Sequence, residues 1–467
     1  MRIVVLGGGP GGYAAAFEAA RLGAEVVLVE ADRLGGTCLN RGCIPTKTIL
    51  RSARIVADTR NGSEFGLDVA AARVDVDQLR ERKERVVDEL VAQVEGTANR
   101  LGVRVVYGHG RLVGPLEIEV ATGDGQIESI EGDGVVLATG SVPFLLPTID
   151  HDLPGVWTSD DAVELGSLPP EVLIIGGGVI GLEFACAYAA FGSKVTLVEL
   201  MEQVLPGSDR RVVRQTQDAL EKMGVRFFLG DAVESVEQVG DRVVGVLRSG
   251  ERIGADVVMS APGRMPHSAG LGFVEAGIEM DRAAVKVDEH LRTNVRGVYA
   301  IGDLIGGMML AHVAEEEGVI AARNAVAELS SDAETPVLQS VRYDCIPACV
   351  YTFPEVAVVG SSRDSAKKAG VDAVQAVAKF SANGKALSEG EAEGFVQMAA
   401  EKETGRIIGC QIVGLHAVEI IHEVALAMRH GMGVRELAET VHAHPTVSEV
   451  VKLAALDAAA KCGRRVT

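Results

Sequence analysis

Two stretches of the chain repeat one order of apolar, small and polar positions. Residues 2–30 begin with a β-branched run, continue through a glycine-rich turn and an alanine-rich segment, and end in a second apolar run that closes on Glu30. Residues 171–199 repeat this order and close on Glu199. A strand, a helix and a second strand in succession predict an α/β fold with parallel sheets.

The glycines in both turns have the spacing of a dinucleotide-binding fingerprint. They are Gly7, Gly9 and Gly12 in the first repeat, and Gly176, Gly178 and Gly181 in the second. The first glycine of such a triplet permits a tight turn, the second lets the backbone approach a pyrophosphate, and the third lets helix and strand pack closely. The closing acid accepts hydrogen bonds from ribose hydroxyls. Two such patterns predict two dinucleotide sites, whereas one alone would also fit an ordinary glycine-rich turn.

The surroundings of these repeats refine the prediction. Glu199 is followed by Leu-Met-Glu-Gln, with no basic residue for a 2′-phosphate, which favours NAD over NADP at the second site. Residues 134–143 and 296–307 each indicate a strand that ends in a small-residue turn, and Asp303 follows the second of these strands. An acid there lies at the ligand crevice of a doubly wound sheet, although a helix-capping role fits the residue equally well.

The apolar run 172–192 is long enough to suggest a membrane span. It contains Glu183 and several glycines, and its first part indicates a buried strand, so we do not predict a membrane helix. From about residue 336 short β-rich runs replace the repeats, and two of them predict a hairpin that turns near residues 403–405. This change indicates a different, α+β domain.

The bulk properties limit the classes of function. A chain of 467 residues predicts two to four domains. The formal net charge of −20 argues against a nucleic-acid or anionic-membrane surface. Residues 1–6 lack the features of an export signal, so we expect a cytoplasmic protein. Structural disulfides are rare in that reducing compartment.

Two of the seven cysteines, Cys38 and Cys43, lie close together after the first repeat. A structural staple, two metal ligands, a redox pair and two unrelated buried thiols all remain open on spacing alone. Residues five apart in a regular helix rise about 7.5 Å, and a disulfide joins Cα atoms less than roughly 7 Å apart. A bond therefore needs a distorted helix, which Gly42 and Pro45 favour. A strained, reducible bond favours the redox interpretation, and we expect Arg41 and a helix N-terminus to favour a thiolate.

The sequence around this pair resembles a known motif. Residues 35–47, GGTCLNRGCIPTK, resemble the redox-disulfide motif of the pyridine nucleotide-disulfide oxidoreductases. The resemblance extends through ATGSVP, YAIGDLIGGMMLAHVAEEEG, YTFPEV and HAHPTVSE to the end of the chain. Within the family, the match is best to the group that oxidises dihydrolipoamide on a carrier protein and reduces NAD. This resemblance implies FAD at the first site, NAD at the second and a C-terminal dimer interface.

The predicted fold is therefore α/β, with two Rossmann-like dinucleotide-binding domains and a C-terminal α+β dimerisation domain. We expect the FAD-binding domain to comprise residues 1–146 and 266–335. The NAD-binding domain is predicted over 147–265 and the dimerisation domain over 336–467.

The resemblance also implies roles for individual residues. Cys38 corresponds to the thiol that exchanges with the dithiol substrate, and Cys43 to the thiol beside the flavin. Lys47 corresponds to a lysine near flavin N5 that pairs with an acid, here Glu183, and Asp303 to the residue that binds the ribityl chain. The cofactor contacts implied for FAD or NAD are Gly7, Gly9, Gly12, Glu30, Gly36, Thr37, Lys47, Gly110, Thr139, Gly140, Ser141, Asp303, Met309, Leu310, Ala311, Gly176, Gly178, Val179, Ile180, Gly181, Glu199, Val233 and Gly263.

A base is expected near the C-terminus. Thiol–disulfide exchange needs a thiolate, so a base must take a proton from the dithiol. In HAHPTVSE, His444 resembles that base and Glu449 the acid that orients it. A metal site built on His442 and His444, or a plain loop before Pro445, remains open on the residues alone.

Some positions depart from the family pattern. Phe353 stands where histidine is common, His267 where asparagine is common and Val313 where lysine is common. Cys345 and Cys349 form an additional pair. The proline between them predicts an extended stretch, in which residues four apart are too distant for a disulfide, so we interpret them as buried apolar thiols, with a second redox role as the alternative. These departures affect the expected substrate or partner preference and remove no implied catalytic group.

The resemblance implies a homodimer that acts on a lipoyl-carrying protein, which is a 2-oxoacid dehydrogenase E2 component, a glycine-cleavage H protein or a lipoate-binding protein. No nucleic acid, membrane or metal ion is expected. A related disulfide reductase or metal-ion reductase is the nearest alternative, and a mainly scaffolding subunit of a multienzyme complex is the alternative from another class. The complete set of cysteines, base and acid favours catalysis.

Overall fold

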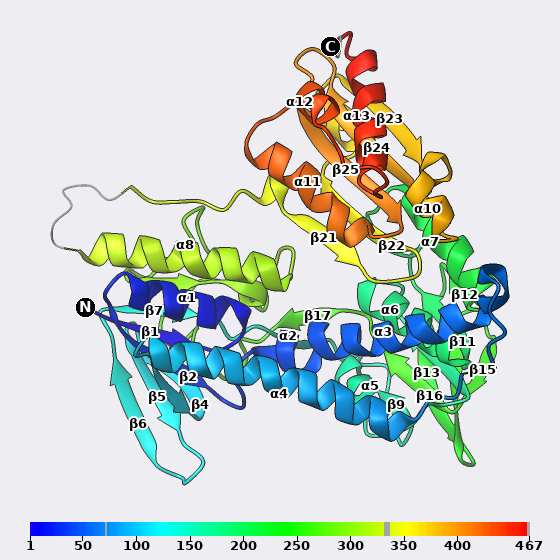
Figure 1. Ribbon diagram of the computed structural model, residues 1–467. Helices are drawn as coiled ribbons and strands as arrows, with labels where there is room; N and C mark the ends of the chain where they lie inside the picture. The colour runs from blue at the N-terminus through cyan, green and yellow to red at the C-terminus, as the bar shows by residue number, and fades with distance from the viewer. Residues whose placement is uncertain (71, 331–336, 465–467) are drawn as a thin grey trace.

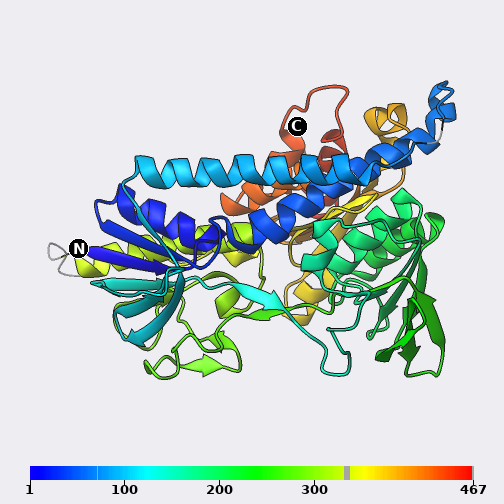
Figure 2. The same ribbon diagram turned by 90° about the horizontal axis from the view of Figure 1, so that it is seen from below.

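The computed structural model describes residues 1–70, 72–330 and 337–464. Figure 1 shows two sheet-and-helix units side by side, with the C-terminal part of the chain above them. Two long helices, α3 (Cys43–Arg60) and α4 (Val76–Arg100), run along both units. The same arrangement is visible from below in Figure 2.

The first unit is built on a five-stranded parallel sheet in the order β20-β7-β1-β2-β3. Helices α1 (Pro10–Arg21) and α8 (Ala311–Leu329) pack against each other over one face. A three-stranded antiparallel sheet shares an apolar cluster with the other face. The strands are β1 (Arg2–Leu6), β2 (Glu25–Glu30), β3 (Arg104–Tyr107), β7 (Gly134–Leu137) and β20 (Val298–Ala300), with β4 (His109–Gly114), β5 (Glu117–Ala121) and β6 (Ile127–Glu131) in the smaller sheet.

The second unit repeats this plan with the parallel order β12-β11-β10-β16-β9. Its strands are β9 (Val156–Trp157), β10 (Glu171–Ile175), β11 (Lys194–Glu199), β12 (Arg226–Leu229) and β16 (Val257–Ser260). A three-stranded sheet of β13 (Val233–Val239), β14 (Arg242–Leu247) and β15 (Arg252–Ala255) packs beside them. The helices are α5 (Ser159–Glu164), α6 (Val179–Phe191) and α7 (Arg210–Lys222).

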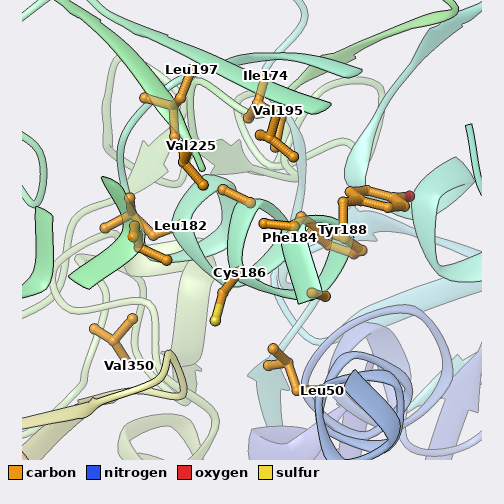
Figure 3. Close-up of a cluster of buried hydrophobic side chains, with 14 of the residues drawn as sticks. Leu50, Ile174, Leu182, Phe184, Cys186, Tyr188, Val195, Leu197, Val225 and Val350 are labelled. Atoms are coloured by element: carbon orange, nitrogen blue, oxygen red, sulfur yellow. The ribbon is translucent and has the colours of Figure 1, made fainter. Parts of the chain in front are cut away.

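Helix α6 is apolar on nearly all sides, with Glu183 as its one charged residue, because residues 181–190 are all buried. Figure 3 shows its residues Leu182, Phe184 and Cys186 between the sheet above and Leu50 and Val350 below. Leu50 belongs to α3 and Val350 to the C-terminal sheet, so α6 joins three parts of the protein in one core. The apolar run that suggested a membrane span is thus a core strand and a core helix.

The C-terminal part contains an antiparallel sheet in the order β21-β22-β25-β24-β23. The predicted hairpin is confirmed, because β24 and β25 pair across residues 402–406. The strands are β21 (Pro347–Val350), β22 (Glu355–Gly360), β23 (Ala373–Lys379), β24 (Phe395–Glu401) and β25 (Ile407–Gly414). The helices are α9 (Arg363–Lys368), α10 (Gly384–Ser388), α11 (Ala417–Arg429), α12 (Val434–Glu439) and α13 (Glu449–Lys461).

Short elements connect these parts. The chain crosses between the two parallel units on β8 (Ser141–Pro143) and β17 (Arg264–Pro266), which pair antiparallel. The remaining elements are α2 (Gly36–Arg41), β18 (Met280–Asp281), β19 (Ala284–Val285) and the 3₁₀ helices η1 (Gly62–Phe65), η2 (Gly302–Ile305), η3 (Tyr343–Cys345) and η4 (Phe380–Ala382).

The predicted fold class is confirmed: there are two parallel sheets with helices and a third, antiparallel sheet. The exact domain boundaries stay a prediction, and the one between residues 335 and 336 adjoins a stretch outside the described residues. Within the described part of the chain, no helix is long and apolar enough to cross a membrane.

The close packing of helix and strand in the second repeat gives a stability prediction. A Cβ atom on Gly181 would lie 2.0 Å from the carbonyl oxygen of Gly176, so Gly181→Ala must push α6 away from its strand. We expect this variant to lose about 2 kcal/mol of unfolding free energy in a denaturant titration. Gly254→Ala in β15 is the control, because its Cβ would meet no atom within 4 Å. Equal stability of both variants would contradict the packing role of Gly181.

Candidate functional site

A cavity of about 1370 Å³ lies where the two parallel units and the C-terminal sheet meet. Residues from both glycine fingerprints, from the cysteine segment and from the start of α8 line it, together with residues of β21 and α11. The predicted residues that line the cavity are Gly7, Gly9, Glu30, Gly36, Thr37, Cys38, Cys43, Lys47, Gly110, Thr139, Gly140, Ser141, Gly178, Val179, Ile180, Glu183, Gly263, Asp303, Met309, Leu310 and Ala311.

The two cysteines lie at a break between helices. Helix α2 ends at Arg41, Gly42 interrupts the helical backbone, and Cys43 is the first residue of α3. A Cβ atom on Gly42 would lie 2.9 Å from the carbonyl oxygen of Thr37, so the turn needs glycine. The predicted distortion is confirmed. The structure describes both residues as free thiols.

The surroundings shift the pKa values of the two thiols in opposite directions. The pKa of Cys43 is lowered to about 7, first by the hydrogen bond from Cys38 and then by the charge of Lys47, against the effect of burial. The pKa of Cys38 is raised by the same hydrogen bond, by burial and by the charge on Cys43. The negative charge of the reduced pair therefore resides on Cys43.

The cation beside the pair is Lys47 and not Arg41. The Arg41 guanidinium forms an ion pair with Asp32 at the surface, so our expectation that Arg41 favours the thiolate is wrong. The second expectation is confirmed, because Cys43 occupies the N-terminus of α3, where free backbone N–H groups favour an anion.

Lys47 is held in place by two residues from distant elements. Its ammonium lies 2.8 and 3.0 Å from the two carboxylate oxygens of Glu183 on α6, as predicted. The same nitrogen lies 4.5 Å from the centre of the Tyr351 ring, and the Tyr351 backbone N–H donates to Glu183 over 3.0 Å. Tyr351 is a site residue that the sequence reasoning did not single out, although it stands in the YTFPEV motif.

The first fingerprint forms a cradle beside the cavity. A Cβ atom on Gly7 would lie 2.2 Å from the carbonyl oxygen of Ala138, and one on Gly12 would lie 1.8 Å from that of Gly7. Gly12 therefore packs helix on strand and does not line the cavity, whereas Gly9 does. Glu30 accepts the Gly8 N–H over 2.7 Å, and burial raises the pKa of its carboxyl.

The second fingerprint repeats this geometry. Glu199 accepts the backbone N–H of Gly177 over 2.6 Å, and Gly176 and Gly181 fill packing positions behind the cavity. At Gly178 an added Cβ would meet no protein atom within 4 Å, so bare backbone faces the open space of the cavity. Val233 differs from the prediction: it is buried in the apolar core of the second unit and does not line the cavity.

Asp303 points to the cavity and not to a helix cap. Its carboxylate accepts the hydroxyl of Ser141, which in turn receives a hydrogen bond of 2.8 Å from Arg264. The neighbouring N–H of Gly302 is bound over 2.6 Å by Glu317, a buried carboxyl whose pKa burial raises to about 7. Arg264 and Glu317 were not predicted, because each contacts a residue that lies more than ten positions away in the sequence.

The expected base and acid are paired. His444 Nδ1 lies 3.0 Å from a carboxylate oxygen of Glu449, whose other oxygen accepts the Thr446 N–H over 2.9 Å. Those two contacts, the backbone one first, lower the pKa of Glu449. His444 leaves 78% of its side chain exposed and does not line the cavity that holds Cys38. One chain therefore does not bring the base to the cysteine pair.

The structure also bears on the metal-site alternative and on the residues that depart from the family pattern. Within the described residues, no group of three or more His, Cys, Asp or Glu side chains could hold a metal ion. Cys345 is buried, as predicted, whereas Cys349 is only half-buried, and both line the cavity. Burial raises the pKa of Cys349 to about 11. Val313 is buried, Phe353 stacks on Arg54, and the His267 carbonyl accepts the hydroxyl of Thr139 beside the cavity.

Comparison with protein families gives two matches that together span most of the chain. Residues 1–318 match the pyridine nucleotide-disulphide oxidoreductase model, and residues 346–455 match the dimerisation domain of the same family. The chain belongs to the pyridine nucleotide-disulphide oxidoreductases. The resemblance inferred from the cysteine motif is thus confirmed.

Individual relatives agree over nearly the whole length. The chain is 38% identical over 468 residues to the mitochondrial dihydrolipoyl dehydrogenase of Dictyostelium discoideum, covering 98% of this chain and 94% of that one. The solved structure of LpdA from Mycobacterium tuberculosis is 29% identical, with a TM-score of 0.91 and coverage of 97% and 99%. A copper(II) complex of the flavoprotein disulfide reductase RclA from Escherichia coli is 26% identical, with a TM-score of 0.86 and coverage of 97% and 98%.

FAD and NAD are the cofactors of this family, and the residues present fit both. The cradle at the first fingerprint would hold FAD, with Glu30 at a ribose and Asp303 at the polar chain. The bare backbone at Gly178 and the acid at Glu199 would hold NAD. The first place and Gly178 line the same cavity, whereas Glu199 is buried beside Gly177 and is not among the lining residues.

The lowered pKa of Cys43 gives a testable pH dependence. In the reduced protein, alkylation of Cys43 by iodoacetamide should accelerate as the pH rises through about 7, because the thiolate is the nucleophile. Lys47→Gln removes a charge that favours the thiolate, so the midpoint should move upward by about one pH unit. Peptide mass spectrometry identifies the modified cysteine. An unchanged midpoint in Lys47→Gln would contradict the role of Lys47, and Lys194→Gln at the surface is the control.

Proposed function

We propose that this protein is an NAD-dependent dihydrolipoamide dehydrogenase, which oxidises a dithiol carried on another protein. The observation that carries the proposal is the pair Cys38 and Cys43, held beside one cavity with Lys47 and both dinucleotide fingerprints. The relatives whose names include dihydrolipoyl dehydrogenase support the substrate. The reaction would take place in the cytoplasm, as the sequence predicts.

In the oxidised enzyme, Cys38 and Cys43 are joined as a disulfide. A substrate thiol loses its proton to the base, and the resulting thiolate attacks the sulfur of Cys38, which releases Cys43 as a thiolate. The second substrate thiol then attacks the mixed disulfide, closes the lipoamide ring and releases Cys38, which regains a proton. Two electrons have now passed from the substrate to the cysteine pair.

Residues of this chain favour release of the thiolate on Cys43 and not on Cys38. The Cys43 thiolate is stabilised by the charge of Lys47 as it leaves. Once Cys38 has regained its proton, the hydrogen bond from Cys38 adds to this effect, and the pKa of Cys43 in the reduced pair is lowered to about 7. A low-pKa sulfur is the better leaving group in exchange, so attack at Cys38 is preferred over attack at Cys43. When bound in the cradle of the first fingerprint, FAD would supply the two-electron redox chemistry that links the cysteine pair to NAD.

We infer that a second copy of the chain supplies the base. His444 is exposed and lies outside the cavity of its own chain, while residues 346–455 match a dimerisation domain. In a two-fold dimer each chain would place its own base at the partner's cysteine pair, giving two shared sites. Glu449 would hold the imidazole with Nδ1 protonated, which leaves Nε2 free to accept the proton.

The natural substrate would be a lipoyl group on a carrier protein. A flexible lipoyl arm could reach Cys38, which lines the open cavity. The carrier is an E2 component, an H protein or a lipoate-binding protein. A scaffolding role without catalysis, or reduction of another disulfide, would leave the purified protein inactive with dihydrolipoamide and NAD. An assay that follows NADH formation from these two compounds therefore tests the proposal directly.

The choice of nicotinamide cofactor follows from Glu199. Its carboxylate, fixed by the N–H groups of Gly177 and Met201, would repel a 2′-phosphate. We expect kcat/KM for NAD to exceed that for NADP by at least about tenfold. Glu199→Gln, which removes the charge and keeps the size, should narrow the difference. Equal use of both cofactors by the unmodified enzyme would contradict this assignment.

The shared site predicts complementation between inactive chains. Cys43→Ser and His444→Ala homodimers should each lose most dihydrolipoamide oxidation, because every site lacks one essential group. A heterodimer of the two variants, purified through two different tags, should recover about half of the normal activity, since one of its two sites combines an intact disulfide with an intact base.

The alternative arrangement predicts a different result. If the base and the cysteine pair belonged to one chain, the heterodimer would contain no complete site and would stay inactive. The matched control is a heterodimer of one chain with both substitutions and one unmodified chain. It should be inactive if each site is shared between chains, and it should keep one working site if each site is built within one chain.

A further inference from the structure

His442 is a buried histidine that the proposed function leaves without a role. It lies two residues before His444, yet only 6% of its side chain is exposed, against 78% for His444. Its Nε2 lies 2.6 Å from a carboxylate oxygen of Glu423, and its Nδ1 lies 3.1 Å from the carbonyl oxygen of Thr440. No third metal-ligating group accompanies it within the described part of the chain.

Both partners of His442 are hydrogen-bond acceptors. A carboxylate and a backbone carbonyl cannot donate, so the imidazole makes both bonds when both of its nitrogens carry hydrogen. In that form the ring also forms an ion pair with Glu423. The side chain thereby links the segment that carries His444 to helix α11.

The segment from Thr440 to Glu449 is fastened at both ends as well. Lys452 on α13 donates to the Thr440 carbonyl over 2.8 Å, and Asn383 donates to the Thr446 carbonyl over 2.9 Å. His442 provides the attachment in between, two residues before the base. Glu423 lies on α11, and the buried side of this helix packs against the C-terminal sheet, which holds Glu423 in place.

The exposed position of His444 makes such an attachment important. Among the described residues, the only hydrogen-bond partner of its ring is Glu449, so the position of the ring depends on the backbone that carries it. A base must lie within hydrogen-bond reach of the proton that it accepts, and a displacement of about 1 Å can cost roughly 10²-fold in rate.

We propose that His442 is a positioning residue for the base His444, and that it acts by fastening the base-carrying segment to α11 through Glu423. The expected effect on the rate of dihydrolipoamide oxidation rests on the proposed function, whereas the expected attachment of the segment to α11 does not. His442 touches neither the cysteine pair nor the cavity and is therefore not a catalytic residue.

The kinetic test compares four variants of the FAD-loaded dimer. His442→Ala and Glu423→Ala each remove the link, and we expect kcat for dihydrolipoamide oxidation to fall about tenfold with KM changed by less than about twofold. Glu423→Gln keeps an acceptor oxygen for His442 and should retain most of the rate. His430→Ala, at an exposed histidine that ends the same helix, should behave as the unmodified enzyme.

A second activity separates positioning from general damage. Oxidation of NADH by ferricyanide needs the flavin but no proton transfer from a dithiol, so it should stay within about twofold of normal in all four variants. A fall of both activities by the same factor would show that His442 is merely structural. Normal dihydrolipoamide oxidation in His442→Ala would also overturn the proposal.

A structural readout keeps this inference distinct from the proposed function. In His442→Ala, amide hydrogen exchange in the peptide that contains residues 440–448 should accelerate at least about threefold, while the peptide containing Cys38 and Cys43 should not change. If the unmodified enzyme fails to oxidise dihydrolipoamide, the proposed function is wrong, and exchange still tests the fastening. If exchange at residues 440–448 is unchanged in His442→Ala, the fastening itself is wrong.

Discussion

The site depends on one ion pair, between the half-buried Lys47 and the buried Glu183. Taking both charges out of water is unfavourable unless their geometry is good and their other hydrogen bonds are satisfied. Here the ammonium meets both carboxylate oxygens, and Tyr351 covers the ammonium with its ring and the carboxylate with its N–H. Lys47 lies one turn after Cys43 on α3, Glu183 lies on α6 and Tyr351 directly follows β21, so the ion pair that fixes the ammonium forms only when these three elements are packed together. The core around α6 in Figure 3 is what holds those elements in contact.

The sequence predicts well those features whose chemistry is local in the chain. The two fingerprints, the helix break between Cys38 and Cys43, and the pairing of His444 with Glu449 each depend on a short stretch, and the structure places them as expected. Pairs across long distances came only from the family resemblance, which matched Glu183 to Lys47. Spacing and periodicity contain no information about that contact, because the two residues lie 136 positions apart.

The expectations that differ from the structure concern contacts between residues that are distant in sequence or side chains whose direction the sequence does not fix. Arg41 is a near neighbour of Cys43 in sequence, but its long side chain reaches the surface and pairs with Asp32. Tyr351, Arg264 and Glu317 were not predicted because they act through the packing of one part of the protein on another. For His442 the sequence left only a metal ligand open, and its burial against Glu423 is what indicates a positioning role.

The central claim is that electrons from a dithiol arrive first at the cysteine pair and leave a thiolate on Cys43. Anaerobic titration of the FAD-loaded enzyme with less than one equivalent of dihydrolipoamide, followed by absorbance, tests it most directly. The account predicts a long-wavelength charge-transfer band between the Cys43 thiolate and oxidised flavin, which grows as the pH rises through about 7 and is absent in Cys43→Ser. Bleaching of the flavin without that band, or a band that survives in Cys43→Ser, would contradict the account.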